Sequence, residues 1–179
     1  YQRSHQKGHL GVENEQRNCR EKIRILNESQ ELIPEVYPVL QQIREQDMIL
    51  ATGHLAPFES LALLRAASNM GIRRSIVSHV SFPVTRAELE LQREYLACGA
   101  MLEHCYYTPY YHLCAWEEIL ESIRQAGAGH ILLSSDLGQI QSPDPEEGMK
   151  RFVEKLHASG ISAGDIRQMI VANPRELLE

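Results

Sequence analysis

Four short apolar runs, each ended by small or polar residues, constrain the fold of this chain more than any other feature. They lie at residues 48–53, 75–78, 100–103 and 130–135. Each run is too short for a helix, and short apolar runs bounded by turn signals are typical of strands buried in a parallel sheet. The sequence therefore predicts four parallel β-strands.

Segments with helical spacing of apolar residues separate and follow these runs. A strand followed by a helix, four times in succession, predicts right-handed βα units. A Thr-x-x-Glu pattern from Thr85 to Glu88 predicts a capping box at the start of the third helix. The helices are expected to begin at or near Pro34, Pro57, Thr85, Trp116, Glu146 and Ser162 or Ala163, with a short final turn at Asn173.

Residues 1–33 fit this pattern poorly. Their first part is rich in Gln, Asn, Arg and Glu and predicts an exposed connection. Residues 22–26 and 31–33 are expected to form a small hairpin around the polar segment between them. His5 and His9 lie in the exposed connection, where no strand is predicted, so we do not expect them to form a metal site. We therefore expect the folded domain to span residues 34–179.

The composition argues against a disordered, a nucleic-acid-binding or a membrane protein. Lys and Arg number 18 and Asp and Glu number 24, which gives a net charge of −6. An apolar content of 43% is typical of a globular chain and argues against disorder. A mildly acidic chain without a basic stripe is not expected to bind nucleic acid. The sequence has neither a membrane-length apolar stretch nor a signal-peptide core, and its scattered cysteines predict free thiols in a cytoplasmic protein.

Polar, titratable residues follow each predicted strand. His54, His79 and His104 lie at the ends of the first three strands, and Asp136 follows the fourth. Function in βα sheets lies at the carboxyl ends of strands, where these side chains would meet. Imidazole and carboxylate are ligands of zinc, so the pattern indicates a metal site. Each residue also has a structural alternative, since a single His or Asp can cap a neighbouring carbonyl or turn.

These segments resemble the amidohydrolase superfamily of metal-dependent hydrolases. The similarity covers roughly residues 20–179 and is closest to a group of small amidohydrolase-like barrels. It rests mainly on Thr52-Gly53-His54 and on the segment 132–139, with further counterparts at residues 32–36, 77–79, 102–105 and 173–178. The resemblance implies that the fold is α/β, with parallel βα units forming strands 5–8 of a (βα)8 TIM barrel.

The resemblance also implies roles for individual residues. His54 and His79 correspond to the metal-binding histidines of strands 5 and 6. Asp136 corresponds to the strand 8 aspartate, which binds metal and carries the proton of the attacking water. The implied cofactor is a divalent metal, foremost zinc. The implied reaction is attack by metal-bound hydroxide on a carbonyl or phosphoryl centre.

Four further residues are predicted to contact substrate: His104, Glu103, Gln139 and Tyr106. The tyrosine-rich segment 105–114 could form a lid over the site or simply pack over the barrel rim. Glu59 could orient His54 or favour the start of its helix. A separate zinc site from Cys98, Cys105, His112 and Cys114 fits by residue type, but its spacing matches no zinc ribbon or finger.

Four strands cannot close an eight-stranded barrel, and the sequence has no His-x-His. The predicted partners are a small-molecule substrate and the N-terminal half of the barrel. That half could come from a longer chain, which we prefer, from another protein, or from a second copy in a homo-oligomer. Two other functions stay open: a metal-assisted decarboxylase or lyase on the same barrel, and a degenerate half-barrel scaffold without catalytic activity.

Overall fold

The structure, a computed structural model, describes residues 24–179. The predicted exposed connection, with His5 and His9, lies outside the described residues, as do the first two residues of the predicted hairpin. The described chain is an α/β unit with a four-stranded, all-parallel sheet in the order β1-β2-β3-β4. This confirms the four predicted parallel strands. Their bounds are β1 (Leu50–Ala51), β2 (Ser75–Val77), β3 (Ala100–Cys105) and β4 (Ile131–Ser134).

The predicted helices are present, with small shifts at their ends. The short helix α4 within the tyrosine-rich segment and the π-helical turn η2 were not predicted. The helices are α1 (Val36–Glu45), α2 (Pro57–Asn69), α3 (Leu89–Ala97), α4 (Tyr107–Tyr110), α5 (Trp116–Ala126), α6 (Pro145–Ala158), α7 (Ala163–Arg167) and α8 (Asn173–Leu178), and the turns are η1 (Ala128–His130) and η2 (Gln168–Ala172).

Two predictions about helix starts have different outcomes. The capping box at Thr85 is wrong, because α3 begins only at Leu89 and the Thr85 hydroxyl donates instead to the carbonyl of His79, at 2.5 Å. Glu59 does serve the start of its helix, since its carboxylate accepts a hydrogen bond from the backbone N–H of Ala56. This satisfies a donor that the first turn of α2 would otherwise leave free.

The predicted small hairpin is confirmed in its described part. Leu26 and Leu32 form an antiparallel bridge, and the N–H of Ile33 donates to the carbonyl of Ile25. Both leucines are buried. Ile25 packs at the edge of a cluster that includes Leu40 of α1 and Leu63 of α2. The hairpin is therefore attached to the helices beside β1.

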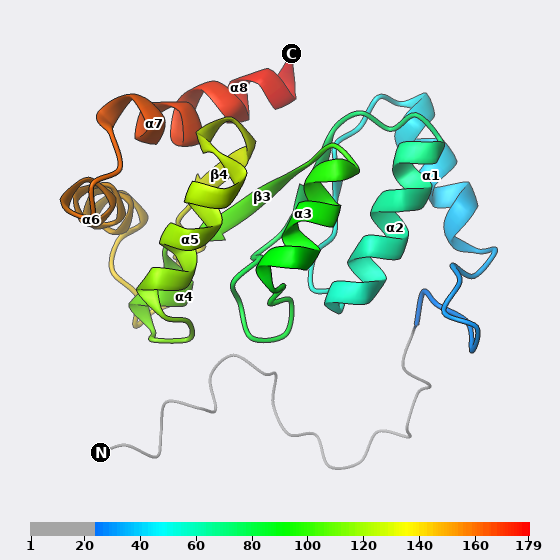
Figure 1. Ribbon diagram of the computed structural model, residues 1–179, viewed down its shortest axis with the longest axis horizontal. Coiled ribbons are helices and arrows are strands. Elements are labelled where there is room, and N and C mark those ends of the chain that lie inside the picture. Colours follow the sequence, from blue (N-terminus) through cyan, green and yellow to red (C-terminus); the bar gives the residue numbers. More distant parts are fainter. Residues whose placement is uncertain (1–23) are drawn as a thin grey trace, which may run out of the picture.

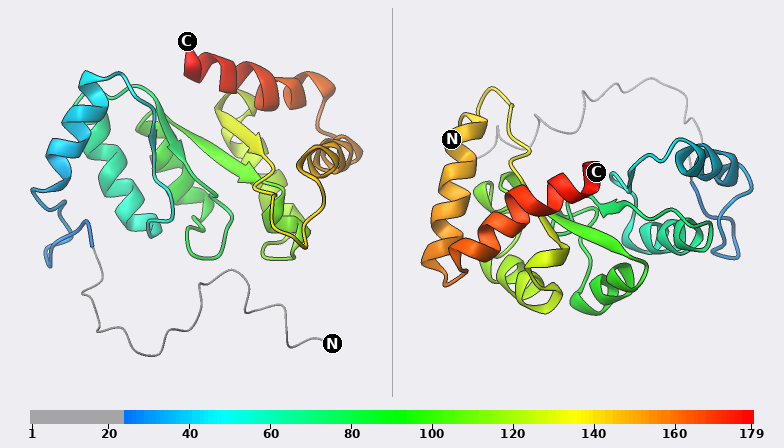
Figure 2. Two further views of the ribbon diagram at one scale, coloured as in Figure 1. Left: turned by 180° about the vertical axis from the view of Figure 1, so that it is seen from behind. Right: turned by 90° about the horizontal axis from the view of Figure 1, so that it is seen from above.

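The two faces of the sheet differ in burial, because successive side chains of a strand point to opposite faces. Helices α2, α3 and α5 cover one face (Figure 1), and Val77, Leu102 and Ile131 on this face are almost fully buried. On the other face, Ile76 and Met101 lie side by side and are half-buried. Figure 2 shows the strands from behind, with no helix of the described residues in front of β3.

Asn173 stabilises the outer edge of β4. Its side chain is fully buried, and its Nδ2 donates to the carbonyls of Ala128 and Ile131 at 2.7 and 2.6 Å. Its Oδ1 accepts from Gln168 at 2.6 Å. At the far end of α8, the guanidinium of Arg74 donates to the carbonyl of Leu177. The C-terminal helices are thus tied both to the edge of β4 and to the start of β2.

A chain of buried polar side chains lies beneath the helix-covered face. His104 is 1% exposed, and its Nδ1 and Nε2 lie 2.9 Å from the Ser81 Oγ and 2.8 Å from the Ser122 Oγ. Ser122 donates its only hydroxyl proton to Gln92, at 2.6 Å. His104 must therefore donate from Nε2 to Ser122 and accept at Nδ1 from Ser81. The imidazole is a neutral link between β3 and its neighbours.

This position corrects the prediction that His104 contacts substrate. The even-numbered residues of β3 point into the core, so the imidazole faces α5 although it lies near the end of the strand. Both ring nitrogens are already hydrogen-bonded within the protein. Burial lowers the pKa of His104 to about 4, which keeps the ring neutral at physiological pH.

None of the helices among residues 24–179 is both long enough and apolar enough to span a bilayer.

We expect His104 to make the fold sensitive to acid. Its folded-state pKa of about 4 lies below the ordinary value of about 6.5, so protons bind more tightly to the unfolded chain. The neutral ring therefore adds to the free energy of unfolding. This stabilisation is complete above about pH 6.5, and roughly 3 kcal/mol of it is lost as the pH falls towards 4. Urea unfolding across this range should show a smaller pH dependence for His104→Gln than for the exposed control His130→Gln. An equal dependence in both variants would contradict the prediction.

We also expect Asn173→Ala to destabilise the chain by about 3 kcal/mol, because the buried carbonyl of Ile131 and the partly buried carbonyl of Ala128 lose their donor. Gln168→Ala is a matched control that removes only the hydrogen bond to the Asn173 Oδ1, and it should cost about 1 kcal/mol. Denaturant unfolding of both variants measures the difference. Equal losses would show that Asn173 does not hold the β4 edge through its amide.

Candidate functional site

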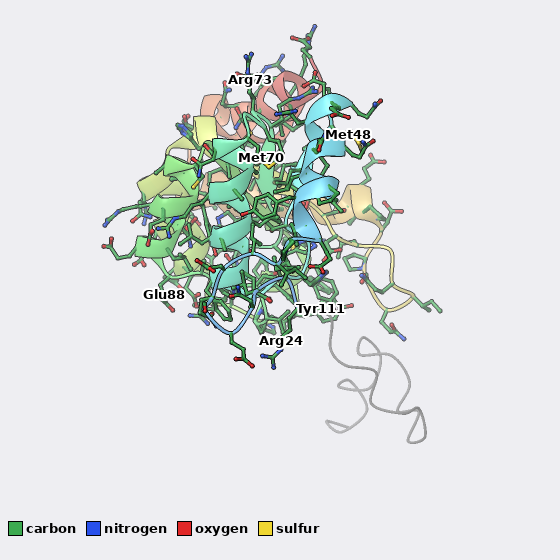
Figure 3. All side chains as sticks on the ribbon, turned by 90° about the vertical axis from the view of Figure 1, so that its right-hand side faces the viewer. Arg24, Met48, Met70, Arg73, Glu88 and Tyr111 are labelled. Carbon is green, nitrogen blue, oxygen red and sulfur yellow. The ribbon has the colours of Figure 1, made fainter. Side chains whose placement is uncertain are left out.

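The carboxyl ends of the four strands gather at one end of the sheet. Figure 3 shows Arg73, which precedes β2, at the opposite end from Glu88 and Tyr111, which follow β2 and β3. Parallel strands bring the residues that follow them to a common edge. The predicted site residues after β1, β2 and β4 therefore start from neighbouring positions.

His79, Cys105 and Asp136 form the strongest candidate site. One ligand atom from each residue lies within 4.8 Å of the others, which is the arrangement needed to share a metal ion. His79 follows β2, Cys105 ends β3 and Asp136 follows β4. The structure thus brings together two of the three metal ligands predicted from the sequence. It adds a cysteine that had been considered only for a different site.

The backbone of His79 is held in an unusual conformation. Its φ of 52° lies in the left-handed region, which residues other than glycine rarely adopt. Its N–H donates to the Glu103 Oε2 at 3.2 Å, and its carbonyl accepts from the Thr85 hydroxyl. Such conformations cost about 1–3 kcal/mol and cluster at functional sites. The surrounding residues thus fix the direction of the imidazole.

Asp136 is also left-handed, with a φ of 50°. The side-chain amide of Gln139 donates to the Asp136 carbonyl at 3.1 Å. Ser142 donates to the Gln139 Oε1 at 2.6 Å, so the Tyr111 hydroxyl must donate to Ser142, at 3.1 Å. This chain of hydrogen bonds connects the loop after β4 to the end of α4. Gln139, predicted to contact substrate, supports the loop that carries Asp136.

Cys105 is almost fully buried, and its sulfur lies 3.1 Å from the Thr108 hydroxyl and 3.9 Å from the Asp136 Oδ2. Burial raises the pKa of the Cys105 thiol to about 12, although the hydrogen bonds with Thr108 oppose the shift. The thiol is thus protonated at neutral pH in the absence of metal. A bound metal would displace this proton, because cysteine binds metals as the thiolate.

The sequence does contain a signal for Cys105. Side chains alternate along a strand, so Glu103 and Cys105 must share the face opposite to His104. His104 resembles the other strand-end histidines in residue type, and this likeness alone led to its prediction as a site residue. Applying the alternation to residues 100–105 would have placed His104 in the core and Cys105 at the site.

His54 lies next to the group without joining it. Its ring centroid is 5.2 Å from that of His79 and 5.9 Å from that of Phe82, and its side chain is exposed. Among the described residues, His79, Cys105 and Asp136 are the only three metal-ligating side chains whose ligand atoms all lie within 4.8 Å of one another. The predicted ligand His54 is therefore adjacent to the candidate site but is not one of the three.

Two buried polar atoms without hydrogen-bond partners lie in this region. Among the side chains described, the His79 Nδ1 and the Ser134 Oγ are the buried nitrogen and oxygen atoms that lack a partner. Ser134 pairs in register with Cys105, so both side chains point to the same face of the sheet. Buried polar groups are rarely left without a hydrogen bond, so both atoms call for an explanation. The His79 Nδ1 does have a charged neighbour, since it lies 3.3 Å from the Glu103 Oε2.

The tyrosine-rich segment is divided between the core and the site. Tyr106, predicted to contact substrate, is buried, with its ring 5.3 Å from that of Phe152. Tyr107 packs against Tyr111 with a centroid distance of 4.6 Å. Burial, followed by the nearby Tyr111, Asp136 and Cys105, raises the pKa of Tyr107. Tyr107 is thus a tyrosine whose pKa responds to both Asp136 and Cys105 of the candidate site.

The other zinc site considered from the sequence is not formed. Within residues 24–179, Cys98, His112 and Cys114 belong to no group of three metal-ligating side chains, and Cys105 belongs to the group described above. Two cavities of about 370 and 100 Å³ also lie elsewhere, and the site residues do not line them. The candidate site is therefore the cluster at the strand ends.

Comparison with known proteins gives a family but no activity. No curated protein matches the sequence. Residues 1–103 match a family described as a family of unknown function, DUF6282. The matched region includes β1, β2 and most of β3, and with them His54, His79 and Glu103. Because the match covers more than half of the chain, the protein belongs to the DUF6282 family.

Proposed function

We propose that this protein is a metal-dependent hydrolase of the amidohydrolase type. The observation that carries the proposal is the group formed by His79, Cys105 and Asp136, whose ligand atoms lie within 4.8 Å of one another at the ends of three adjacent strands. The buried Ser134 Oγ supports it, because this hydroxyl has no hydrogen-bond partner and lies on the same face of the sheet as Cys105.

The donor set fits zinc better than a hard cation. Imidazole, thiolate and carboxylate are all zinc ligands, and a site with three protein ligands leaves a position for water or substrate. Magnesium and calcium prefer oxygen donors, so the Cys105 sulfur disfavours both. His54 is a candidate fourth ligand, because its exposed side chain lies beside His79 and is free to change rotamer.

Residues of the chain would transfer the proton and bind the substrate. A bound metal ion polarises an acyl or phosphoryl oxygen and makes water nucleophilic at neutral pH. Asp136 is exposed at the mouth of the site, where its carboxylate is free to accept the proton of the attacking water and pass it to the leaving group. The buried Ser134 hydroxyl would donate a hydrogen bond to the substrate.

We infer further that the sheet is half of a (βα)8 barrel. Neither β1 nor β4 has a second strand partner among the described residues, and the face carrying Ile76 and Met101 is only half-buried. Open edges and a partly exposed apolar face favour further strands. An N-terminal half from the same polypeptide, another protein or a second copy would supply them. Cys105 departs from the amidohydrolase pattern, in which the tip of strand 7 has no fixed ligand.

The proposed site can be tested by its binding of metal. We expect the purified protein to bind about one zinc ion, measured by elemental analysis and by competition with a chromophoric chelator. His79→Ala and Cys105→Ala should each weaken binding by more than about 100-fold, beyond the 10- to 100-fold cost of changing a residue that only supports a ligand. Cys98→Ala is the matched control, because Cys98 lies outside the group, and it should bind zinc normally. Zinc binding that is unaffected by both site variants would contradict the proposed site.

The role of Asp136 can be tested by turnover. Asp136→Asn keeps an oxygen ligand but removes the proton acceptor, so we expect it to lower kcat by about 100-fold or more. The assay compares esters, amides, lactones and phosphoesters, and includes carboxylic acids to detect decarboxylation. Asp144→Asn is a control in the same loop. Hydrolysis that survives Asp136→Asn would exclude the assigned role, and turnover of carboxylic acids alone would favour the decarboxylase alternative.

A further inference from the structure

Glu103 makes two contacts with His79 through a single oxygen atom. Its Oε2 accepts from the backbone N–H of His79 at 3.2 Å and lies 3.3 Å from the His79 Nδ1. Both side chains are largely shielded, with exposures of 17% for His79 and 19% for Glu103. The carboxylate therefore acts on the backbone and on the ring of the same residue.

The position of the carboxylate decides where the ring proton lies. The Nδ1 atom is buried, and its contact with Oε2 lacks the alignment of a hydrogen bond. If Nδ1 carried no proton, its lone pair would face carboxylate oxygen in a region with little water to screen the repulsion. A proton on Nδ1 turns this repulsion into attraction. The neutral imidazole then keeps its lone pair on Nε2, which is free to bind a metal.

The same carboxylate helps to hold the strained backbone. The left-handed φ of His79 is maintained by Glu103 at its N–H and by Thr85 at its carbonyl. Glu103 itself is fixed by β3, where its own carbonyl accepts from the N–H of Val80. The strand that carries Cys105 thus also orients His79.

We infer that Glu103 is a positioning residue that presents the Nε2 of His79 to the proposed metal site. The inference rests on the proposed function and deepens it, because it assigns to Glu103 a task other than the substrate contact predicted from the sequence. A carboxylate that faces the second nitrogen of a histidine ligand fixes its tautomer and raises its basicity.

The tautomer can be measured in the metal-free protein. Long-range ¹H–¹⁵N spectra recorded at alkaline pH distinguish the two neutral forms of histidine, and the signals of His79 are assigned by their loss in His79→Gln. We expect the Nδ1–H form in the wild-type protein. Glu103→Gln, which has nearly the same size but no charge, should shift His79 towards the Nε2–H form. Glu88→Gln, an exposed control before α3, should leave the spectrum of His79 unchanged.

Zinc affinity provides a second measurement on the same variants. Glu103→Gln should weaken zinc binding by about 10- to 100-fold, whereas Glu88→Gln should not change it. Circular dichroism and denaturant unfolding verify that each variant is folded, and Glu103→Asp, which restores the charge, should recover part of the loss. A purely structural role would not change the tautomer.

Two results separate this inference from the proposed function. A wild-type His79 in the Nε2–H form, or a tautomer that does not respond to Glu103→Gln, would overturn the role of Glu103 even if zinc binds. Absence of zinc binding by a protein with the Nδ1–H form would overturn the metal site and leave the contact between Glu103 and the ring established.

Discussion

The alternation of side chains along β3 links the core of this protein to its candidate site. His104 points under the helices and is hydrogen-bonded to Ser81 and Ser122, whereas Glu103 and Cys105 point to the opposite face. One strand of six residues therefore supplies a neutral core histidine, a carboxylate against His79 and a sulfur next to Asp136. The burial of one set of side chains fixes the position of the other.

Strain at the site is concentrated where the chain leaves the sheet. His79 and Asp136 both have left-handed backbones, and each is held by hydrogen bonds from neighbouring segments. The Thr85 hydroxyl contacts the His79 carbonyl, and the Gln139 amide contacts the Asp136 carbonyl. Such conformations persist only when the surrounding structure supports them. The sheet and the loops together thus prepare the direction of the two side chains before any ligand arrives.

The sequence was sufficient to predict the parallel sheet, most helices and the small hairpin, because apolar periodicity and turn residues are local signals. It also led to His79 and Asp136, which follow buried strands directly. The prediction was wrong for His104 and missed Cys105, because the face of β3 on which each side chain lies decides its role, whatever its residue type. The π-helical turn η2 and the carbonyl-capping role of Asn173 depend on packing against β4, which local spacing does not encode.

The hydrogen bond between Ser122 and His104 has a consequence for how this protein tolerates change. Ser122 lies on α5, on the far side of the sheet from Cys105, and is fully buried. A substitution that removes the Ser122 hydroxyl would leave the Nε2–H of His104 without its acceptor in the core. Because His104 directly precedes Cys105 on β3, a core contact of α5 and the thiol of the candidate site are anchored by neighbouring residues of one strand.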